Sequence, residues 1–354
     1  MDLSVLIVTS PSLCHPSTIL IDSVIDSLSL IPHLSLYETP IHIIMDGYHV
    51  IQSHTIPDSE GDNPDTLSTT ENDIDTLNGD TLTSTPPSKV RLKKGIIDRS
   101  IEENYSEYRK RIFEKYGHQP RFHIHRLQSH HGFALAVKYG LTCCNTQYAL
   151  ILQHDRVFAT LIDFLPHILQ TMETHTHIRY VGFPSSMSSN HVNVMTTKGL
   201  KSLHRASILV EGQEERLKLQ PLIFWYDSQH IAHVKRYLEI YQPYSTLSQD
   251  LVAYLTKPTI NAMRIRRGDF IEDRFGQIQR QALIALRYND DLLWKLFHWY
   301  GSYLVWDAHL DYRCNGTEEY IVHLRGRKQA ERHITATMEK VLKVTEVAET
   351  GYEK

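Results

Sequence analysis

The chain begins with an apolar strand pattern, a helical pattern and a second apolar strand pattern. Residues 4–9 form a run rich in β-branched side chains that a Ser-Pro-Ser turn closes. Residues 17–30 repeat apolar side chains at helical spacing, and residues 41–45 form the second run, which ends at Asp46. This order predicts a βαβ unit, in which the two strands are parallel neighbours. The sequence therefore predicts an α/β fold with a mostly parallel central sheet flanked by helices.

The length allows one large domain or two small ones, and we expect one large domain. The 354 residues are 22% charged and 41% hydrophobic, which is ordinary for a globular protein and excludes collagen and coiled coil. We expect this domain over residues 1–330 and a C-terminal helical tail over residues 331–354. Residues 52–90 are rich in Asp, Ser, Thr, Asn and Pro and lack aromatic side chains, so we expect a disordered acidic insertion there.

The sequence favours a cytoplasmic location. No apolar run approaches the roughly 20 residues that span a bilayer. The apolar N-terminus is not preceded by the basic residues of a signal peptide. The four cysteines show no CxxC spacing, which fits a reducing compartment and gives no zinc motif.

Charge is unevenly distributed along the chain. Residues 1–88 hold 13 acidic side chains and no Lys or Arg, so the remainder carries all 37 basic groups against 28 acidic ones. A basic body suits an anionic ligand. Because no basic helix or aromatic RNA motif accompanies it, the sequence argues against nucleic acid as a partner.

Polar residues follow three of the predicted buried strands. Thr9 and Ser10 follow the first, Asp46 follows the second, and Gln153 and Asp155 follow a run over residues 148–152. Open α/β sheets bind ligands at the carboxyl ends of their strands, so these are candidate binding residues. Asp155 is also a candidate ligand of Mg²⁺ or Mn²⁺, which prefer carboxylate and phosphate oxygens. The alternative for Asp155 is a structural cap of the turn that follows.

Further candidates lie toward the C-terminus. Residues 222–225 resemble a strand and residues 231–241 a helix. Beyond them, Glu272 and Asp273 offer carboxylates that could take a proton from a hydroxyl group. The alternative is a solvated ion-pair cluster with the arginines around them, which would contribute little.

A family resemblance connects these residues. The Gly/Ala-rich segment Gly132–Leu141, followed by the strand and polar end over Tyr148–Phe158, resembles the core of GT-A-type nucleotide-sugar glycosyltransferases, particularly the family-2-like ones. Those proteins place such a helix before a strand that ends in an Asp-x-Asp motif. The resemblance implies a GT-A-like, Rossmann-like fold, with a nucleotide-binding half over residues 1–185 and an acceptor half over residues 186–330.

The resemblance also implies a reaction and a donor site. A sugar would move from a nucleoside diphosphate sugar, with UDP-sugars favoured, to a hydroxyl group of a glycan, protein or small molecule. Asp46 would lie near the uracil or ribose. Asp155 matches the second acid of the motif and would bind Mn²⁺ or Mg²⁺ together with His323. Gln153 replaces the first acid, which leaves metal dependence open.

For the acceptor side, Glu272 and Asp273 resemble the pair that carries the catalytic base of inverting members, with Asp273 favoured. Arg266, Arg267 or Arg325 would neutralise the leaving diphosphate.

Two other functions stay open. A sugar nucleotidyltransferase ranks lower, because residues 10–15 lack the glycines and basic group such enzymes usually carry after the first strand. The second open function is that of a degenerate, non-catalytic binding protein, since Gln153 replaces an acid of the motif.

Overall fold

The computed structural model describes residues 2–34, 38–50, 95–185, 188, 191–204, 207–308, 320–324, 326 and 328–337. The expected acidic insertion over residues 52–90 and the last part of the expected tail, residues 338–354, lie outside the described residues. Residues 328–337 are helical.

The strands of the described residues form one large sheet and two small ones. The large sheet contains β1 (Leu3–Thr9), β2 (Ile41–Met45), β5 (Phe122–Arg126), β6 (Tyr148–Gln153), β8 (Tyr180–Gly182), β9 (Ile208–Leu209), β10 (Leu217–Pro221), β11 (His230–His233) and β12 (Ser302–Asp307). The small sheets pair β3 (His49–Val50) with β4 (Ile96–Ile97) and β7 (Arg156–Phe158) with β13 (Ile321–His323).

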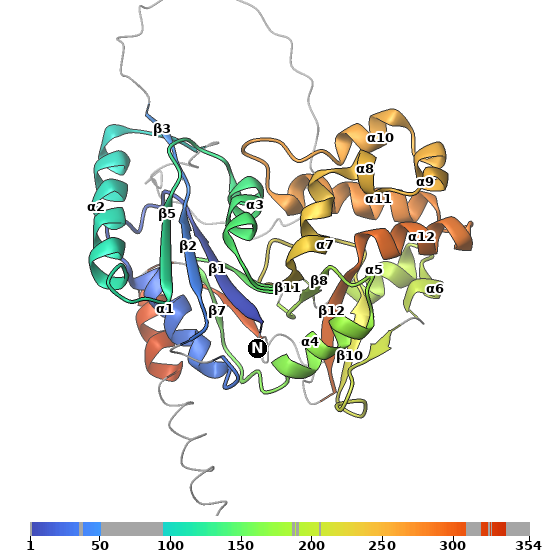
Figure 1. The fold of residues 1–354 in the computed structure, drawn as a ribbon, viewed down its shortest axis with the longest axis horizontal. Coiled ribbons are helices and arrows are strands. Elements are labelled where there is room, and N and C mark those ends of the chain that lie inside the picture. Colours follow the sequence, from blue (N-terminus) through green and yellow to red (C-terminus); the bar gives the residue numbers. More distant parts are fainter. Residues whose placement is uncertain are drawn as a thin grey trace, which may run out of the picture.

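The order of the large sheet is β5-β2-β1-β6-β11-β8-β12-β10-β9 (Figure 1). The first four strands are mutually parallel, whereas β11 and β10 run against the others. Every residue of β1 is buried, as expected for a strand with parallel neighbours on both sides. The predicted α/β class with a mostly parallel sheet is confirmed.

Helices and single turns connect the strands. The longer helices are α1 (Ile19–Ser27), α2 (Arg99–Tyr116), α3 (Phe133–Cys143), α4 (Leu165–Thr174), α11 (Gln277–Ala285) and α12 (Asp290–Tyr300). The shorter ones are α5 (His191–Thr197), α6 (Lys201–His204), α7 (Val234–Leu238), α8 (Pro243–Thr246), α9 (Gln249–Tyr254) and α10 (Lys257–Ala262). The described residues also form two 3₁₀ turns, Leu28–Leu30 and Glu239–Tyr241, and a π-helical turn, Glu272–Gly276.

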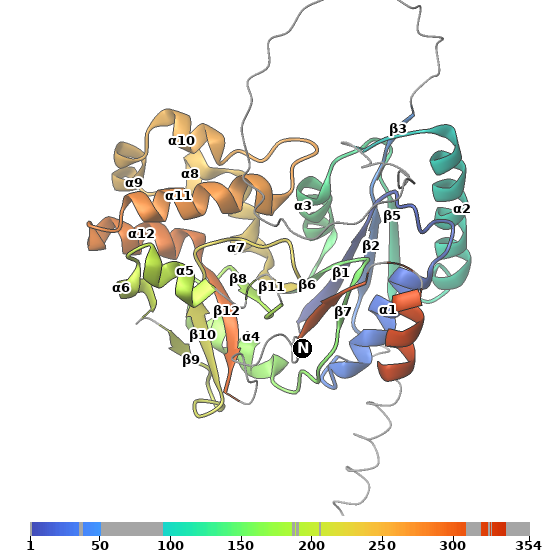
Figure 2. The same ribbon diagram turned by 180° about the vertical axis from the view of Figure 1, so that it is seen from behind.

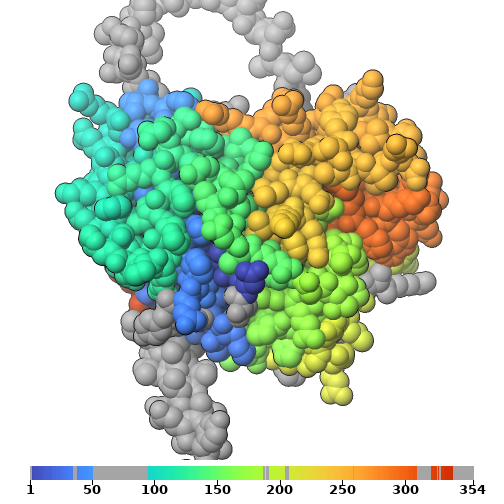
Figure 3. All heavy atoms as spheres, viewed as in Figure 1, coloured from blue at the N-terminus to red at the C-terminus, as the bar shows by residue number. Residues whose placement is uncertain are grey.

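Helices α2 and α3 lie on opposite sides of the N-terminal strands in both ribbon views (Figures 1 and 2). Helix α3 packs tightly at Gly140, where an added Cβ would come within 2.3 Å of Cδ1 of Leu6. In the space-filling view the N-terminal elements, blue to green, and the C-terminal elements, gold to orange, abut directly (Figure 3). The two parts of the chain therefore pack against each other on this face.

Two sequence expectations on the C-terminal side are wrong. The helix expected over residues 231–241 is a strand, β11, at its start, and becomes helical only at Val234. Its apolar run pairs with β6 on one side and β8 on the other, and this pairing overrides the helical periodicity. The strand expected over residues 222–225 lies earlier, as β10.

Candidate functional site

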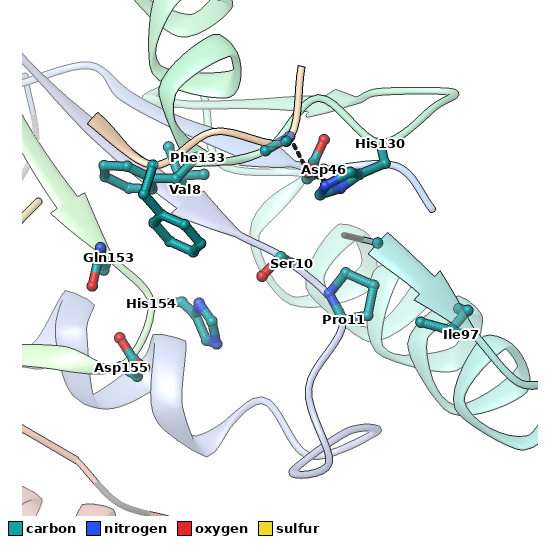
Figure 4. Close-up of a pocket in the computed structure, with 14 residues that line it drawn as sticks. Val8, Ser10, Pro11, Asp46, Ile97, His130, Phe133, Gln153, His154 and Asp155 are labelled. Carbon is teal, nitrogen blue, oxygen red and sulfur yellow. Dashed lines mark hydrogen bonds and ion pairs between the residues drawn. The ribbon is translucent and has the colours of Figure 1, made fainter. Parts of the chain in front are cut away.

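A cavity of about 300 Å³ opens at the carboxyl ends of β1, β2 and β6 (Figure 4). Four predicted binding residues line it: Ser10 after β1, Asp46 after β2, and Gln153 and Asp155 at the end of β6. The three strands are adjacent and parallel, so the residues that follow them meet at one edge of the sheet. The structure thus brings together residues that are up to 145 positions apart in the sequence.

Thr9, the remaining residue of this predicted group, does not line the cavity in the described structure. Its side chain is 1% exposed, and its Oγ1 lies 3.1 Å from the hydroxyl oxygen of Tyr108 in α2. The hydroxyl pair joins the end of β1 to α2. Thr9 therefore supports the strand end from behind the site.

Asp46 organises the loop that forms one wall of the cavity. Its carboxylate accepts hydrogen bonds from the backbone N–H groups of Gly47, His131 and Gly132 at 2.8–3.0 Å, and Oδ2 lies 2.9 Å from Nδ1 of His130. Burial alone would raise the pKa of Asp46, but these hydrogen bonds outweigh it and lower that pKa. A carboxylate offers about four acceptor positions, and three backbone N–H groups already donate to this one, with the ring of His130 close beside it.

The aromatic wall of the cavity comes from two distant segments. Phe133 begins α3, and Phe270 belongs to the loop that follows α10. Their rings are stacked with centroids 6.3 Å apart and an interplanar angle of 16°. The two loops are held together where the N–H of Gly268 donates to the carbonyl oxygen of His131 at 2.8 Å. The cavity is therefore apolar on this side and polar at the end of β6.

Asp155 and His323, the predicted metal ligands, are in contact. Nε2 of His323 lies 3.1 Å from Oδ2 of Asp155, and the side chains are 47% and 28% exposed. Burial raises the pKa of Asp155, but the hydrogen bond from His323 and the nearby charges of His154 and Arg156 outweigh it, which leaves a pKa of about 2. Asp155 is thus held as a carboxylate with an imidazole beside it.

Gln153 is engaged with a neighbour. Its Oε1 accepts a hydrogen bond from Nε of Arg156 at 2.7 Å. The described residues contain no group of three His, Cys, Asp or Glu side chains arranged to hold a metal ion. Asp155 and His323 therefore form a pair and not a larger cluster among the described residues.

The two candidates for the catalytic base, Glu272 and Asp273, lie in the π-helical turn. Their environments differ. Oε2 of Glu272 accepts a hydrogen bond from the backbone N–H of Asp227 at 3.4 Å, whereas Asp273 is exposed. Burial raises the pKa of Glu272. Isolated π-turns within helices are frequent at functional sites. Neither residue lines the cavity. The positive charge of Arg156, the residue next to Asp155, nevertheless acts to lower the pKa of Glu272.

Asp227 is a further candidate residue that the sequence did not indicate. Its side chain is 4% exposed, and Oδ1 has no hydrogen-bond partner among the described residues. Burial, followed by the charge of Glu272, raises the pKa of Asp227 well above its usual value. A buried, incompletely paired carboxyl group is a recognised sign of a functional site. No periodicity or motif in the sequence distinguishes this residue.

Two of the three predicted diphosphate-binding arginines line a different hollow. Arg266 and Arg267 are exposed and line a second hollow with Asn261, Arg264 and Ile265. Arg325 lies outside the described residues. The cavity that contains Asp155 has none of these three among its described lining residues.

No helix in the part of the chain that the structure describes is both long and apolar enough to cross a lipid bilayer.

Comparisons with known proteins give likenesses of fold. No protein-family model and no curated protein sequence matches the chain. Among solved structures, S. aureus TarS 1-349 in complex with UDP-GlcNAc is 11% identical with a TM-score of 0.32, over 67% of this chain and 46% of that one. The chain spans 38–65% of the length of the TarS chains that it matches.

Two further structures match over 95% of both chains. The galactosyltransferase LgtC in complex with donor and acceptor sugar analogs is 10% identical with a TM-score of 0.35. A putative glucose-1-phosphate thymidylyltransferase from Bacillus anthracis is 8% identical with a TM-score of 0.38. A shared fold does not specify a reaction, which depends on the residues of the site. The solved structures that resemble this chain thus include glycosyltransferases and a putative thymidylyltransferase.

Proposed function

We propose that the protein transfers a sugar from a nucleoside diphosphate sugar to a hydroxyl acceptor. A UDP-sugar is the favoured donor. One observation carries the proposal: Ser10, Gln153 and Asp155 line a single cavity at the ends of adjacent parallel strands. The stacked Phe133 and Phe270 offer an apolar wall for a base, and the end of β6 offers polar atoms for ribose and phosphate.

A divalent cation fits this site with help from the substrate. Mg²⁺ is usually held by one or two carboxylates together with substrate phosphate oxygens. Asp155 and His323 would hold Mn²⁺ or Mg²⁺, and the diphosphate would supply the remaining ligands. The bound cation would stabilise negative charge on the diphosphate.

In the proposed transfer, the acceptor oxygen forms a bond to the anomeric carbon while the bond from that carbon to the diphosphate breaks. The diphosphate leaves with the bonding electrons, and the acceptor proton moves to a carboxylate. The half-buried Glu272, whose pKa burial raises, suits this role better than the exposed Asp273. We therefore assign the base to Glu272 and expect inversion at the anomeric carbon.

Calorimetric titration of UDP, with and without Mn²⁺, tests the donor site. We expect binding that strengthens with Mn²⁺ in the wild type, is lost in Asp155→Ala, and persists in Asp291→Ala, which removes an exposed carboxylate on α12. Absence of binding to any nucleoside diphosphate would overturn the proposal. Binding that is independent of both the cation and Asp155 would instead point to a cation-free site centred on Gln153.

A non-catalytic nucleotide-sugar-binding protein is the second candidate. The observation that favours it is the Gln153–Arg156 hydrogen bond at the position of the first motif acid. Release of UDP from UDP-sugars, measured over hours with the wild type and Glu272→Gln, separates the two. Turnover that Glu272→Gln abolishes supports the transferase, whereas binding without any turnover supports the second candidate.

A further inference from the structure

Three arginines gather at one hollow close to the end of α10. Arg264, Arg266 and Arg267 line it together with Asn261 and Ile265, and we call it the arginine hollow. All three arginines are exposed, whereas Ile265 is buried and anchors the segment. The hollow therefore concentrates three permanent positive charges at one concave place on the surface.

These charges are not neutralised within the described part of the protein. Other arginines have carboxylate partners: Arg216 pairs with Asp163 and Asp307, and Arg274 pairs with Asp269. No described ion pair involves Arg264, Arg266 or Arg267.

The carboxylate that is nearest in sequence is already engaged. Oδ2 of Asp269 lies 3.0 Å from Nε of Arg274 and accepts a hydrogen bond from the backbone N–H of Arg266 at 2.7 Å. Three like charges in one hollow repel one another, and a bound anion relieves that repulsion. Guanidinium groups match phosphate oxygens in a bidentate fashion, which makes phosphate a favoured partner.

The arginine hollow and the donor cavity share a structural wall. Gly268 and Phe270, from the same segment as the arginines, line the cavity. On its other side, Nη1 of Arg267 donates a hydrogen bond to Oγ of Ser129 at 3.1 Å, one residue before the cavity-lining His130. Figure 1 shows this segment, in orange, running from α10 toward α3. An anion in the hollow would thus lie beside the proposed donor site but outside it.

We propose that the arginine hollow binds a phosphate group of the acceptor, so that the substrate that receives the sugar is a phosphate-bearing molecule. The proposal rests on the proposed function, because only a sugar transfer has an acceptor. It differs from the sequence-based expectation that Arg266 and Arg267 neutralise the donor's diphosphate, because these residues line the hollow and not the cavity with Asp155.

Titration of glucose 6-phosphate into the full chain saturated with UDP tests the proposal. Glucose and glucuronic acid serve as uncharged and carboxylate probes. The test variant is Arg264→Gln/Arg266→Gln. The control, Arg99→Gln/Lys110→Gln, removes two charges from the exposed face of α2. We expect glucose 6-phosphate to bind about tenfold more weakly to the test variant only, while UDP affinity stays unchanged.

Several results would overturn the proposal. They are equal binding of glucose 6-phosphate to both variants, equal binding of glucuronic acid and glucose 6-phosphate by the wild type, or a matching loss of UDP affinity in the test variant. The last result would indicate that the arginines bind the donor's diphosphate. If UDP fails to bind while glucose 6-phosphate still binds through the arginines, the proposed function fails and the phosphate site stands.

Discussion

Nε2 of His323 lies 3.1 Å from Oδ2 of Asp155, although 168 positions separate the two residues in the sequence. The short sheet of β13 and β7 creates this contact, because His323 lies opposite Arg156 in its register. The backbone N–H of Leu324 also donates to the carbonyl oxygen of Asp155 at 2.7 Å. The C-terminal segment thus packs against Asp155, which lines the cavity.

This contact predicts that Asp155 and His323 act as a unit. Replacing His323 with Ala should weaken Mn²⁺-dependent UDP binding by about tenfold or more. The double variant with Asp155→Ala should lose little beyond Asp155→Ala alone, because the two side chains serve one site. Titration of the four proteins measures the coupling, with His33→Ala as an exposed control. Additive losses would show that the two residues act separately.

Gly132 and Gly268 form a matched pair of positive-φ positions, with φ of 78° and 83°. An added Cβ on Gly132 would lie 2.6 Å from Cα of Gly268, whereas one on Gly268 would have 3.6 Å to Nε2 of His130. Either substitution to Ala carries a backbone strain of roughly 1–3 kcal/mol. Only Gly132→Ala also forces the two loops apart, so urea unfolding should show the larger loss for it. Equal losses would contradict a tight contact between these loops.

His42 should make the fold sensitive to acid. Burial, then the charges of His123 and His125, lowers the pKa of His42 to about 4. The unfolded chain binds this proton near pH 6.5. The unfolded state therefore gains protons first as pH falls, and stability is lost between about pH 6.5 and pH 4.

This loss amounts to about 2 kcal/mol for His42 between pH 7 and pH 5. His42→Gln, which stays neutral, should remove that part of the pH dependence in urea unfolding, while the exposed His118→Gln should not. Buried His230, with a pKa lowered by burial to about 4, leaves some acid sensitivity in both variants. An unchanged slope in His42→Gln would show that His42 is not held neutral.

Asp227 should have the opposite pH dependence. Because burial and the charge of Glu272 raise its pKa, the folded state keeps a proton that the unfolded state releases, and stability falls as pH rises above about 4. Asp227→Asn imitates the protonated carboxyl group. It should stabilise the protein at pH 8 and leave it nearly unchanged at pH 4. Asp273→Asn is the exposed control. A less stable Asp227→Asn protein at pH 8 would show that the folded state needs the carboxylate.

Much of the candidate site could be inferred from local sequence patterns. The runs over residues 4–9, 41–45 and 148–152 are the parallel strands β1, β2 and β6. A short run of apolar β-branched residues indicates a buried strand wherever it occurs, and parallel strands end at the same edge of a sheet. The sequence therefore predicts, without the rest of the fold, that Ser10 and Asp155 lie at one site, and both line the same cavity.

Other features depended on contacts between distant segments. Residues 231–233 have a pattern compatible with a helix, and pairing with β6 and β8 makes them a strand. Asp227 looks like an ordinary polar residue until the turn at Glu272 buries it, and Arg266 was expected at the donor but lies in a separate hollow. Periodicity and polarity are local properties of a chain. Burial, partner groups and the cavity that a loop lines arise only when segments far apart in sequence pack together.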